Sequence, residues 1–258
     1  MVSAAMKKPF LVAVPLVVIV GGAIVVVNVA FDQMRVNTHV VAQPVREIVV
    51  NSARGDTDLI PGDDRIEVRE TQHYAFIRPQ LKQDVTDGVL TLDSDCEGSG
   101  LKCYADLRVT VPPGIKVVVD ADSGDVDARG IDVRNAHLQS HSGDVRLELV
   151  GRQQLVWAHT DSGDIDAAAA DAHAIDAQTD SGDVIVDAGR DARRVVARTD
   201  SGDVAVSVPA GQYAVDAQTD TGDVTIDGIM RNDGAPKSIQ ARTDSGDITL
   251  RASRQRSS

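Results

Sequence analysis

Aromatic residues are scarce, at 3% of the 258 residues, with one tryptophan, three tyrosines and three phenylalanines. Aromatic rings supply much of the buried area of an ordinary globular core. Val, Ile, Leu and Ala must therefore fill the interior, which favours a thin core repeated along an axis over one thick centre. Basic residues are also few, at 26 Lys and Arg against 39 Asp and Glu, for a formal net charge of -13. Because nucleic-acid binding needs a basic face, a nucleic-acid partner is excluded.

Cysteine is almost absent: the chain contains only Cys96 and Cys103, with a Gly- and Ser-rich segment between them. A zinc site would need further ligands, and no histidine lies nearby. In an exported chain, a close pair of this kind usually forms a disulfide. We therefore predict a Cys96–Cys103 disulfide, which stabilises the fold by about 2–3 kcal/mol because it closes a small loop.

One long run lacks charge altogether: residues 10–31 read FLVAVPLVVIVGGAIVVVNVAF. As a helix rising ~1.5 Å per residue, this run crosses a hydrocarbon core of ~30 Å. Lys7 and Lys8 precede it, so the positive-inside rule places residues 1–9 in the cytoplasm and the C-terminal domain outside. The sequence thus predicts a cell-membrane protein with a single transmembrane signal anchor at 10–31 and an extracellular C-terminal domain.

A cleaved signal peptide is the alternative for this segment. Its apolar region would be ~7–15 residues long and would end in a small-x-small site. The run here is longer, and its best candidate cleavage site, Asn28-Val29-Ala30, matches the small-x-small pattern poorly. No cysteine precedes Cys96, which also excludes an anchor on a lipid-modified N-terminal cysteine. The uncleaved anchor is favoured.

An internal repeat dominates the rest of the chain. The tripeptide Ser/Thr-Gly-Asp occurs seven times at spacings of 19, 20, 19, 20, 20 and 24 residues. We interpret it as a repeated turn, because glycine supplies the backbone freedom that a tight turn needs. Residues 230–238 insert a loop and account for the longest spacing. The turn glycines are Gly124, Gly143, Gly163, Gly182, Gly202, Gly222 and Gly246.

Around each turn, apolar and polar residues alternate with period 2. In one copy, Ile175, Ala177 and Thr179 share one face, and after the turn Val184 and Val186 do the same. This pattern predicts a strand, a tight turn and a second strand. The inward residues are small before the turn and branched after it, which suits a narrow core between two sheets.

A unit of about 20 residues cannot bury its apolar face alone, so the copies must stack. We predict an all-β fold, a parallel β-solenoid over 119–250 with one repeat per rung and rungs ~4.8 Å apart. A propeller needs ~40–45 residues per blade, and a sandwich does not require turns at fixed spacing; both remain as alternatives. Residues 44–118 are predicted to form an irregular β cap with the disulfide, 32–43 a spacer and 251–258 a disordered tail.

These repeats resemble the bacterial putative-adhesin family of unknown function, which is defined by recurring Ser-Gly-Asp-Val/Ile β-repeats. The similarity extends over roughly 44–250 and implies a β-solenoid-like ectodomain at the bacterial surface, with no catalytic residues. The segments that resemble the family are TDSGDI (160–165), TDSGDV (179–184), TDSGDV (199–204), TDTGDV (219–224), TDSGDI (243–248) and VTVPPGIKVVVDADSGDV (109–126).

Stacking would align the acidic residues in two files. Neighbouring carboxylates ~4.8 Å apart would repel by about 0.9 kcal/mol in water and about 3.5 kcal/mol at an effective dielectric of 20. Backbone N–H groups that donate to each carboxylate offset this repulsion in the favoured interpretation; bound Ca²⁺ is the alternative. The first file is Asp125, Asp144, Asp164, Asp183, Asp203, Asp223 and Asp247; the second is Asp122, Asp161, Asp180, Asp200, Asp220 and Asp244, interrupted by His141. The calcium candidates are Asp164, Asp183, Asp203 and Asp223.

Other sequence signals are weaker. Arg54-Gly55-Asp56 spells the integrin-binding tripeptide, but it lies where the repeat demands a Gly-Asp turn, so we interpret it as structural. Gly98-Ser99-Gly100 lacks the Gly-Lys-Ser/Thr of a phosphate-binding loop. No G-x-S-x-G motif occurs, and Trp157 is the single tryptophan that could face a sugar ring. An enzyme is therefore disfavoured, and no cofactor other than calcium is expected.

The function that fits these patterns is a membrane-anchored, surface-displayed adhesin or envelope-binding protein without catalysis. The alternative is an accessory or sensory protein of envelope stress, whose ectodomain docks a protein partner. The expected partners are thus the membrane, through 10–31, and an envelope component or protein. For contact we expect the flat polar face formed by residues before the turns: Asp176, Gln178, Arg198, Gln218 and Arg242.

Overall fold

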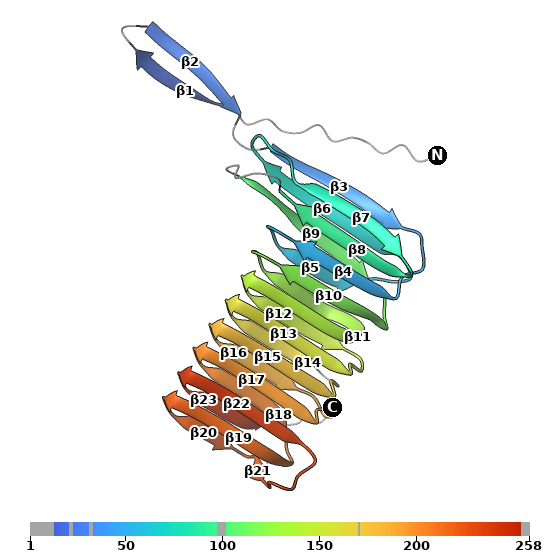
Figure 1. Cartoon of the computed structure of the whole chain (residues 1–258), viewed down its shortest axis with the longest axis vertical. Coiled ribbons are helices and arrows are strands. Elements are labelled where there is room, and N and C mark those ends of the chain that lie inside the picture. The colour runs from blue at the N-terminus through green and yellow to red at the C-terminus, as the bar shows by residue number, and fades with distance from the viewer. Residues whose placement is uncertain (1–12, 21–22, 31–32, 97–101, 170, 254–258) are drawn as a thin grey trace.

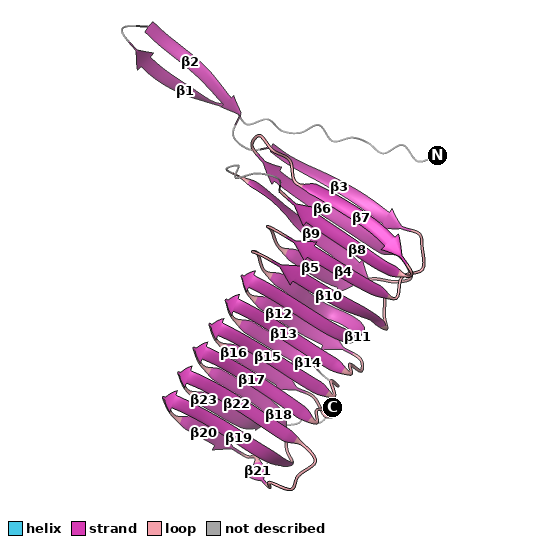
Figure 2. Ribbon diagram, in the orientation of Figure 1, coloured by secondary structure: helices cyan, strands magenta, loops and turns pink. Residues whose placement is uncertain are grey.

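The computed structural model describes residues 13–20, 23–30, 33–96, 102–169 and 171–253. From residue 33 onward, 21 strands, β3 to β23, form one continuous curled sheet that stacks along the long axis of the molecule (Figure 1). Every regular element among the described residues is a strand (Figure 2). The all-β fold with a parallel, solenoid-like stack of repeats is confirmed.

The sheet folds over into two layers, and a rung consists of one strand in each layer joined by a turn. The first layer contains, in spatial order, β7 (Gln80–Thr86), β8 (Val89–Asp95), β4 (Glu47–Ser52), β10 (Ile115–Ala121), the second half of β11 (Val126–Ser142), β13 (Leu155–Ser162), β15 (Ala174–Ser181), β17 (Arg194–Ser201), β22 (Ser238–Ser245) and β19 (Gln212–Thr221). The short strand β21 (Met230–Arg231) pairs with β19 at the end of this layer.

The second layer contains the strands that follow the turns. In spatial order they are β3 (Gln33–Val41), β6 (Ile66–Tyr74), β9 (Cys103–Val111), β5 (Thr57–Pro61), the first half of β11, β12 (Val145–Val150), β14 (Ile165–Ala169), β16 (Val184–Ala188), β18 (Val204–Pro209), β23 (Ile248–Ser253) and β20 (Val224–Asp227). From β9 and β8 onward, neighbouring strands in both layers run parallel.

The core is the narrow space between the layers, as the alternating pattern predicts. Ala177 and Thr179 of β15 point inward and are buried, as are Val184 and Val186 of β16. Each inward residue pairs with its counterpart one repeat further on, for example Thr179 with Thr199. Because the same small or branched side chain recurs in each rung, the interior is filled without large aromatic rings.

The turn glycines are needed because successive turns lie in direct backbone contact. All seven have φ between +122° and +154°, which L side chains rarely adopt. A Cβ on Gly182 would overlap the carbonyl oxygen of Gly163 in the preceding rung. On the other side, the Gly182 N–H donates to the carbonyl of Ser201 at 2.9 Å. Each turn therefore contacts the turn of the preceding rung through backbone atoms.

At the C-terminal end of the stack, chain order and spatial order differ. The rung β22–β23, which comes last in the chain, lies between β17–β18 and β19–β20. The turn of Gly246 thus lies between those of Gly202 and Gly222, so the last two repeats do not stack in sequence order. The inserted loop at 230–238 provides the length for this return.

Side-chain size gives a physical reason for the exchange. Ile239, Ile248 and Leu250 of the inner rung are fully buried. The corresponding positions of the terminal rung carry smaller side chains, Val215 and Val224, and Val224 is 40% exposed. With β22–β23 in the inner position, two more methylene groups are buried than with β19–β20 there. Each buried methylene group favours this order by about 0.8 kcal/mol.

The N-terminal end of the stack is also out of chain order and is covered by antiparallel strands. β4 and β5, joined by the Arg54-Gly55-Asp56 turn, lie between β8–β9 and β10–β11. The parallel stack therefore includes residues 47–61, which form a strand, a Gly-Asp turn and a strand within the segment predicted as an irregular cap. β3 and β6 pair antiparallel beyond β9, and β7 pairs antiparallel beyond β8, so the edge of the parallel stack is covered.

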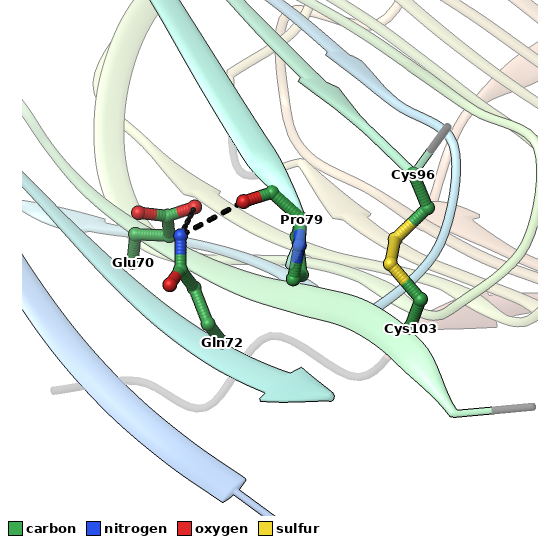
Figure 3. The surroundings of a disulfide bond; sticks show 5 residues. All are labelled: Glu70, Gln72, Pro79, Cys96 and Cys103. Atoms are coloured by element: carbon green, nitrogen blue, oxygen red, sulfur yellow. Dashed lines mark hydrogen bonds between the residues drawn. A yellow bond between two sulfur atoms is a disulfide. The ribbon is translucent and has the colours of Figure 1, made fainter. Parts of the chain in front are cut away.

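The predicted spacer at 32–43 is mostly a strand: β3 pairs with β6 over Gln33–Val41. A buried polar cluster fastens it, because Asn37 Nδ2 donates to Glu70 Oε2 at 2.9 Å. The other carboxylate oxygen of Glu70 accepts from Gln72 Nε2 at 2.8 Å, and that nitrogen also donates to the Pro79 carbonyl at 3.0 Å (Figure 3). At the other end of the chain, the predicted tail begins later than expected, because β23 extends to Ser253; residues 254–258 lie outside the described residues.

The predicted disulfide between Cys96 and Cys103 is confirmed (Figure 3), with the two Cα atoms 6.0 Å apart. It connects the end of β8 to the start of β9, which are the two strands of the first parallel rung. The bond therefore closes the loop that stands in place of the Gly-Asp turn in this rung.

The transmembrane helix predicted for 10–31 is not seen. Its described residues form two antiparallel strands instead, β1 (Ala13–Val20) and β2 (Ala23–Ala30). The run is rich in Val and Ile, whose branched side chains favour strands. No helix in the described part of the chain is long and apolar enough to span a membrane.

Replacing Gly182 by Ala should destabilise the fold by about 3 kcal/mol, because the new methyl group meets the Gly163 carbonyl at a positive φ. Gly234→Ala is the matched control, since the added Cβ there lies 3.5 Å from Asn232 Oδ1. Urea denaturation measures both. Equal stability of the two variants would contradict the direct contact between turns.

Candidate binding face

The carboxylates of the turns form a hydrogen-bonded ladder. In each rung, Oδ1 of the turn Asp accepts the backbone N–H of the turn Asp in the next rung, with N···O distances of 2.8–2.9 Å. Backbone donation thus offsets the repulsion, as predicted. The ladder contains the first predicted file in the spatial order Asp125, Asp144, Asp164, Asp183, Asp203, Asp247 and Asp223. It continues towards the N-terminus through Asp56 and Asp106.

One cation also lies against this ladder. Arg146 of β12 contacts Asp125 Oδ2 at 3.2 Å and also pairs with Asp144. Burial alone would lower the pKa of Arg146, but the hydrogen bonds and charges of the two carboxylates outweigh burial and raise it.

The calcium candidates Asp164, Asp183, Asp203 and Asp223 are all members of the ladder. Within the described ranges, no group of three or more His, Cys, Asp or Glu side chains is arranged to hold a metal ion. Calcium binding stays a prediction, and the EDTA comparison below tests it.

A second row of hydrogen bonds, which was not predicted from the sequence, lies just inside the turns. The hydroxyl of each turn-flanking Thr donates to the carbonyl of the turn Gly in the preceding rung, at 2.9–3.0 Å. Ser140 does the same to Gly124 at 2.9 Å. In the sequence, the threonine that recurs in Thr-Asp-Ser/Thr-Gly-Asp could have indicated these hydrogen bonds. The residues are Thr160, Thr179, Thr199, Thr243 and Thr219.

The outer surface of the first layer has one polar side chain per rung in a straight row. Register pairs Gln139 with His159, His159 with Gln178, Gln178 with Arg198, Arg198 with Arg242, and Arg242 with Gln218. We call these six residues the polar row. The structure brings together four of the predicted contact residues here and places the fifth, Asp176, in the adjacent row beside Trp157.

Two members of the row were missed, namely Gln139 and His159. Each member directly precedes the Ser or Thr that lies inside the turn, so an alignment of the repeats on that residue would have identified both. The second acidic file lies beside the row on the same surface, in the spatial order Asp122, His141, Asp161, Asp180, Asp200, Asp244 and Asp220.

At its C-terminal part the row borders an open groove of about 430 Å³. Arg198, Arg242 and Gln218 lie on its surface, with Asp200, Asp216 and Asp244 around them. Arg242 Nη2 is 3.6 Å from Asp244 Oδ1. The groove therefore contains both donors and acceptors, and it lies on an exposed face.

Near the middle of the stack, three rings lie almost parallel. His137 stacks on Trp157 with ring centroids 3.9 Å apart, and Trp157 stacks on His159 at 5.4 Å. His159 Nε2 lies 3.2 Å from Asp161 Oδ1. Burial, with help from the charge of Lys116, lowers the pKa of His137. The rings of His137 and Trp157 lie directly beside the polar row, and His159 belongs to it.

A family model described as Toastrack DUF4097 matches residues 115–251, which is more than half of the chain. The chain belongs to the toastrack family. This match confirms the resemblance drawn from the Ser-Gly-Asp repeats. No curated protein matches the sequence.

Several solved bacterial structures are similar to this toastrack chain. A putative adhesin from Parabacteroides merdae has 12% identity and a TM-score of 0.49, covering 86% of this chain and 96% of its own. A putative cell adhesion protein from Clostridium sporogenes has 11% identity and a TM-score of 0.44, covering 85% and 100%. A putative adhesin from Bacteroides fragilis has 16% identity and a TM-score of 0.39, covering 85% and 97%.

The Arg54-Gly55-Asp56 tripeptide is a turn of the toastrack stack. Gly55 has φ +109°, and its N–H donates to the Ser123 carbonyl at 3.1 Å. Asp56 Oδ1 accepts from the N–H of Asp125 at 2.9 Å. The structural interpretation of this tripeptide is confirmed.

Replacing Asp203 by Ala removes the acceptor for the Asp247 N–H and should destabilise the toastrack by about 1–2 kcal/mol. Asp200→Ala changes an exposed carboxylate on the outer face and should cost less than about 0.5 kcal/mol. Asp203→Asn keeps an acceptor and should restore part of the loss. Urea denaturation of the three variants measures this; equal losses for Asp203→Ala and Asp200→Ala would contradict the ladder.

Acidification should destabilise the fold in part through His137. Because its folded-state pKa lies below the usual 6.5, the unfolded chain binds the proton more readily. The stability that neutral His137 contributes is fully present above the pKa of this histidine in the unfolded chain. It is lost as the pH falls through its lower pKa in the folded state. Between about pH 7.5 and 5.5, the Tm should therefore fall less steeply for His137→Gln than for the wild type. Parallel slopes in thermal unfolding would contradict this assignment.

Proposed function

We propose that this toastrack chain is a membrane-anchored protein whose β-solenoid ectodomain is displayed outside the cell membrane. In this proposal the ectodomain binds an envelope or surface component through the polar row, without catalysis. The observation that best supports it is the row itself: six consecutive rungs each present one polar side chain at the same position of one flat layer. Such repetition suits an extended partner.

Two features support the location. Residues 10–31 are uncharged and follow Lys7 and Lys8, the order expected of a signal anchor. The Cys96–Cys103 disulfide is typical of a compartment outside the reducing cytosol.

Binding without catalysis is supported by the shape and exposure of the face. Enzyme sites hold their reactive groups in concave pockets that exclude water. Here Arg198, Arg242 and Gln218 are exposed on the outer surface of a sheet. A face of this kind favours many weak polar contacts over a reaction at one atom.

Localisation is tested with the full chain carrying a C-terminal epitope, expressed in a bacterium. We expect the chain to stay with the membrane through carbonate extraction and its epitope to be cleaved by protease added outside the cell membrane. The variant Val18→Asp/Val25→Asp places two charges in the apolar run and should be lost from the membrane fraction. A soluble wild-type chain or a protected epitope would contradict the proposal.

Binding is tested by immobilising the full chain and incubating it with bacterial envelope fractions, in parallel with calcium and with EDTA. We expect retention of envelope material in both arms, and at least about tenfold less with Arg198→Ala/Arg242→Ala. Arg129→Ala, on the other layer, is the control. Retention lost only in EDTA would support the calcium prediction. Retention of a single protein by both double variant and wild type would favour the accessory-protein alternative.

A further inference from the structure

We propose that the polar row holds one extended, neutral glycan chain that lies along the long axis of the stack, with a sugar ring packed on Trp157. This inference rests on the proposed function and names the ligand class for the same face. It follows from the spacing of the row, from the paired donors and acceptors within it, and from the position of the single tryptophan.

The spacing of the row matches a linear polymer of sugar rings. Rungs in a parallel stack lie ~4.8 Å apart, which is close to the length that one pyranose ring adds to an extended glycan. From Gln139 to Gln218 the six side chains occupy consecutive rungs, so the row extends over roughly 24 Å. A glycan on this line would meet one row residue per sugar.

Three side chains of the row are already oriented by carboxylates on the same strands. Gln178 Nε2 donates to Asp176 Oδ1 at 2.6 Å, and Gln218 Nε2 donates to Asp216 Oδ1 at 2.9 Å. His159 makes the corresponding contact with Asp161. Each pair places a donor group beside acceptor oxygens, and a sugar hydroxyl can use both because it donates and accepts.

Trp157 supplies an apolar surface at the edge of the row. The indole is half-buried and rests on His137 on one side. His159, two residues further along the same strand, is its second ring neighbour, at 5.4 Å between centroids. In the next rung the residue paired with Trp157 is Asp176, which carries no ring. Leu155, on the same strand, is 45% exposed. The CH face of a pyranose ring packs well on such a surface, while its hydroxyls reach Gln178 and Asp176.

Charge selects a neutral chain over an acidic one. The second acidic file borders the row at Asp161, Asp180, Asp200 and Asp244, and the whole chain has a formal charge of -13. A carboxylate ~4 Å from one of these groups would be repelled by about 1 kcal/mol in water. Repeated along the chain, this repulsion disfavours an acidic glycan.

The face is poorly suited to a folded protein partner. Protein interfaces usually centre on a cluster of apolar anchor residues. Among the described residues of the first layer from β10 to β19, Leu155 is the only exposed large hydrophobic side chain, and Val196, in the same outward row as Trp157, is fully buried. Added strands need a sheet edge, and the row lies on the flat side of the first layer.

The test uses the full chain in lipid nanodiscs and the fluorescence of Trp157, which is the only tryptophan. Cellohexaose, chitohexaose and maltohexaose are the neutral probes, with hexagalacturonate and hexalysine as charged ones. We expect a saturable change in Trp157 emission with at least one neutral hexamer, and at least about tenfold weaker binding of the matching disaccharide and of hexagalacturonate.

Variants separate the row from the rest of the surface. Calorimetry should show at least about tenfold weaker binding of the same hexamer to Trp157→Ala and to Arg198→Ala/Arg242→Ala. Trp157→Phe keeps a ring and should lose less affinity than Trp157→Ala. Arg129→Ala on the opposite layer should bind as the wild type does. Circular dichroism confirms that each variant is folded.

Three results would overturn the inference: no response to any neutral hexamer, a response to hexalysine alone, or an affinity for the neutral hexamer that is unchanged in both Trp157→Ala and Arg198→Ala/Arg242→Ala. Failure of the inference is distinguishable from failure of the proposed function. If envelope material is still retained in a way that needs Arg198 and Arg242, the face binds a different ligand. If retention does not depend on the row, the proposed function fails as well.

Discussion

The structure depends on one close contact, the approach of each turn glycine to the backbone of the preceding turn. Where a side chain would stand at Gly182, the carbonyl oxygen of Gly163 lies instead. This contact sets the distance between rungs at the turn edge. It also brings the Asp N–H of one rung to the carboxylate of its neighbour and the Thr hydroxyl to the glycine carbonyl. The alignment of the acidic file thus follows from the glycine contact, and backbone N–H donors offset part of the repulsion between its carboxylates.

The two ends of the stack show how a repeated fold stops. At each end, the outermost parallel rung is not the first or last rung of the sequence, because that rung lies one position further in. The chain therefore continues from both ends of the outermost rung. β8–β9 is further closed by the disulfide and covered by antiparallel strands. β19–β20 is the outermost rung at the other end, and acids such as Asp216 and Asp227 lie along it. Charged edges of this kind discourage pairing with other chains.

Stacking by backbone and small inward side chains leaves the outer surfaces free to vary. The positions that alternate with Ala177 and Thr179 point to solvent, so their side chains contribute little to the core. On the first layer these positions hold amides, guanidinium groups, carboxylates, one indole and three imidazoles in straight rows. A scaffold of this type places stability in the turns and the interior, and so leaves the outer rows available for the proposed recognition.

The sequence alone determined the repeat, the turn glycines, the disulfide and the alternation of inward and outward residues, because each depends on local chemistry or on period 2. It also placed Gln178, Arg198, Arg242 and Gln218 on one face. Only the tertiary structure decided that Gly246 lies between Gly202 and Gly222, since all repeats carry nearly the same turn and either order satisfies the ladder. The strand at Gln33–Val41 was likewise set by long-range contacts, among them the bond from Asn37 to the buried Glu70. Rung order and edge pairing depend on which side chains become buried, and that comparison exists only once the chain has folded.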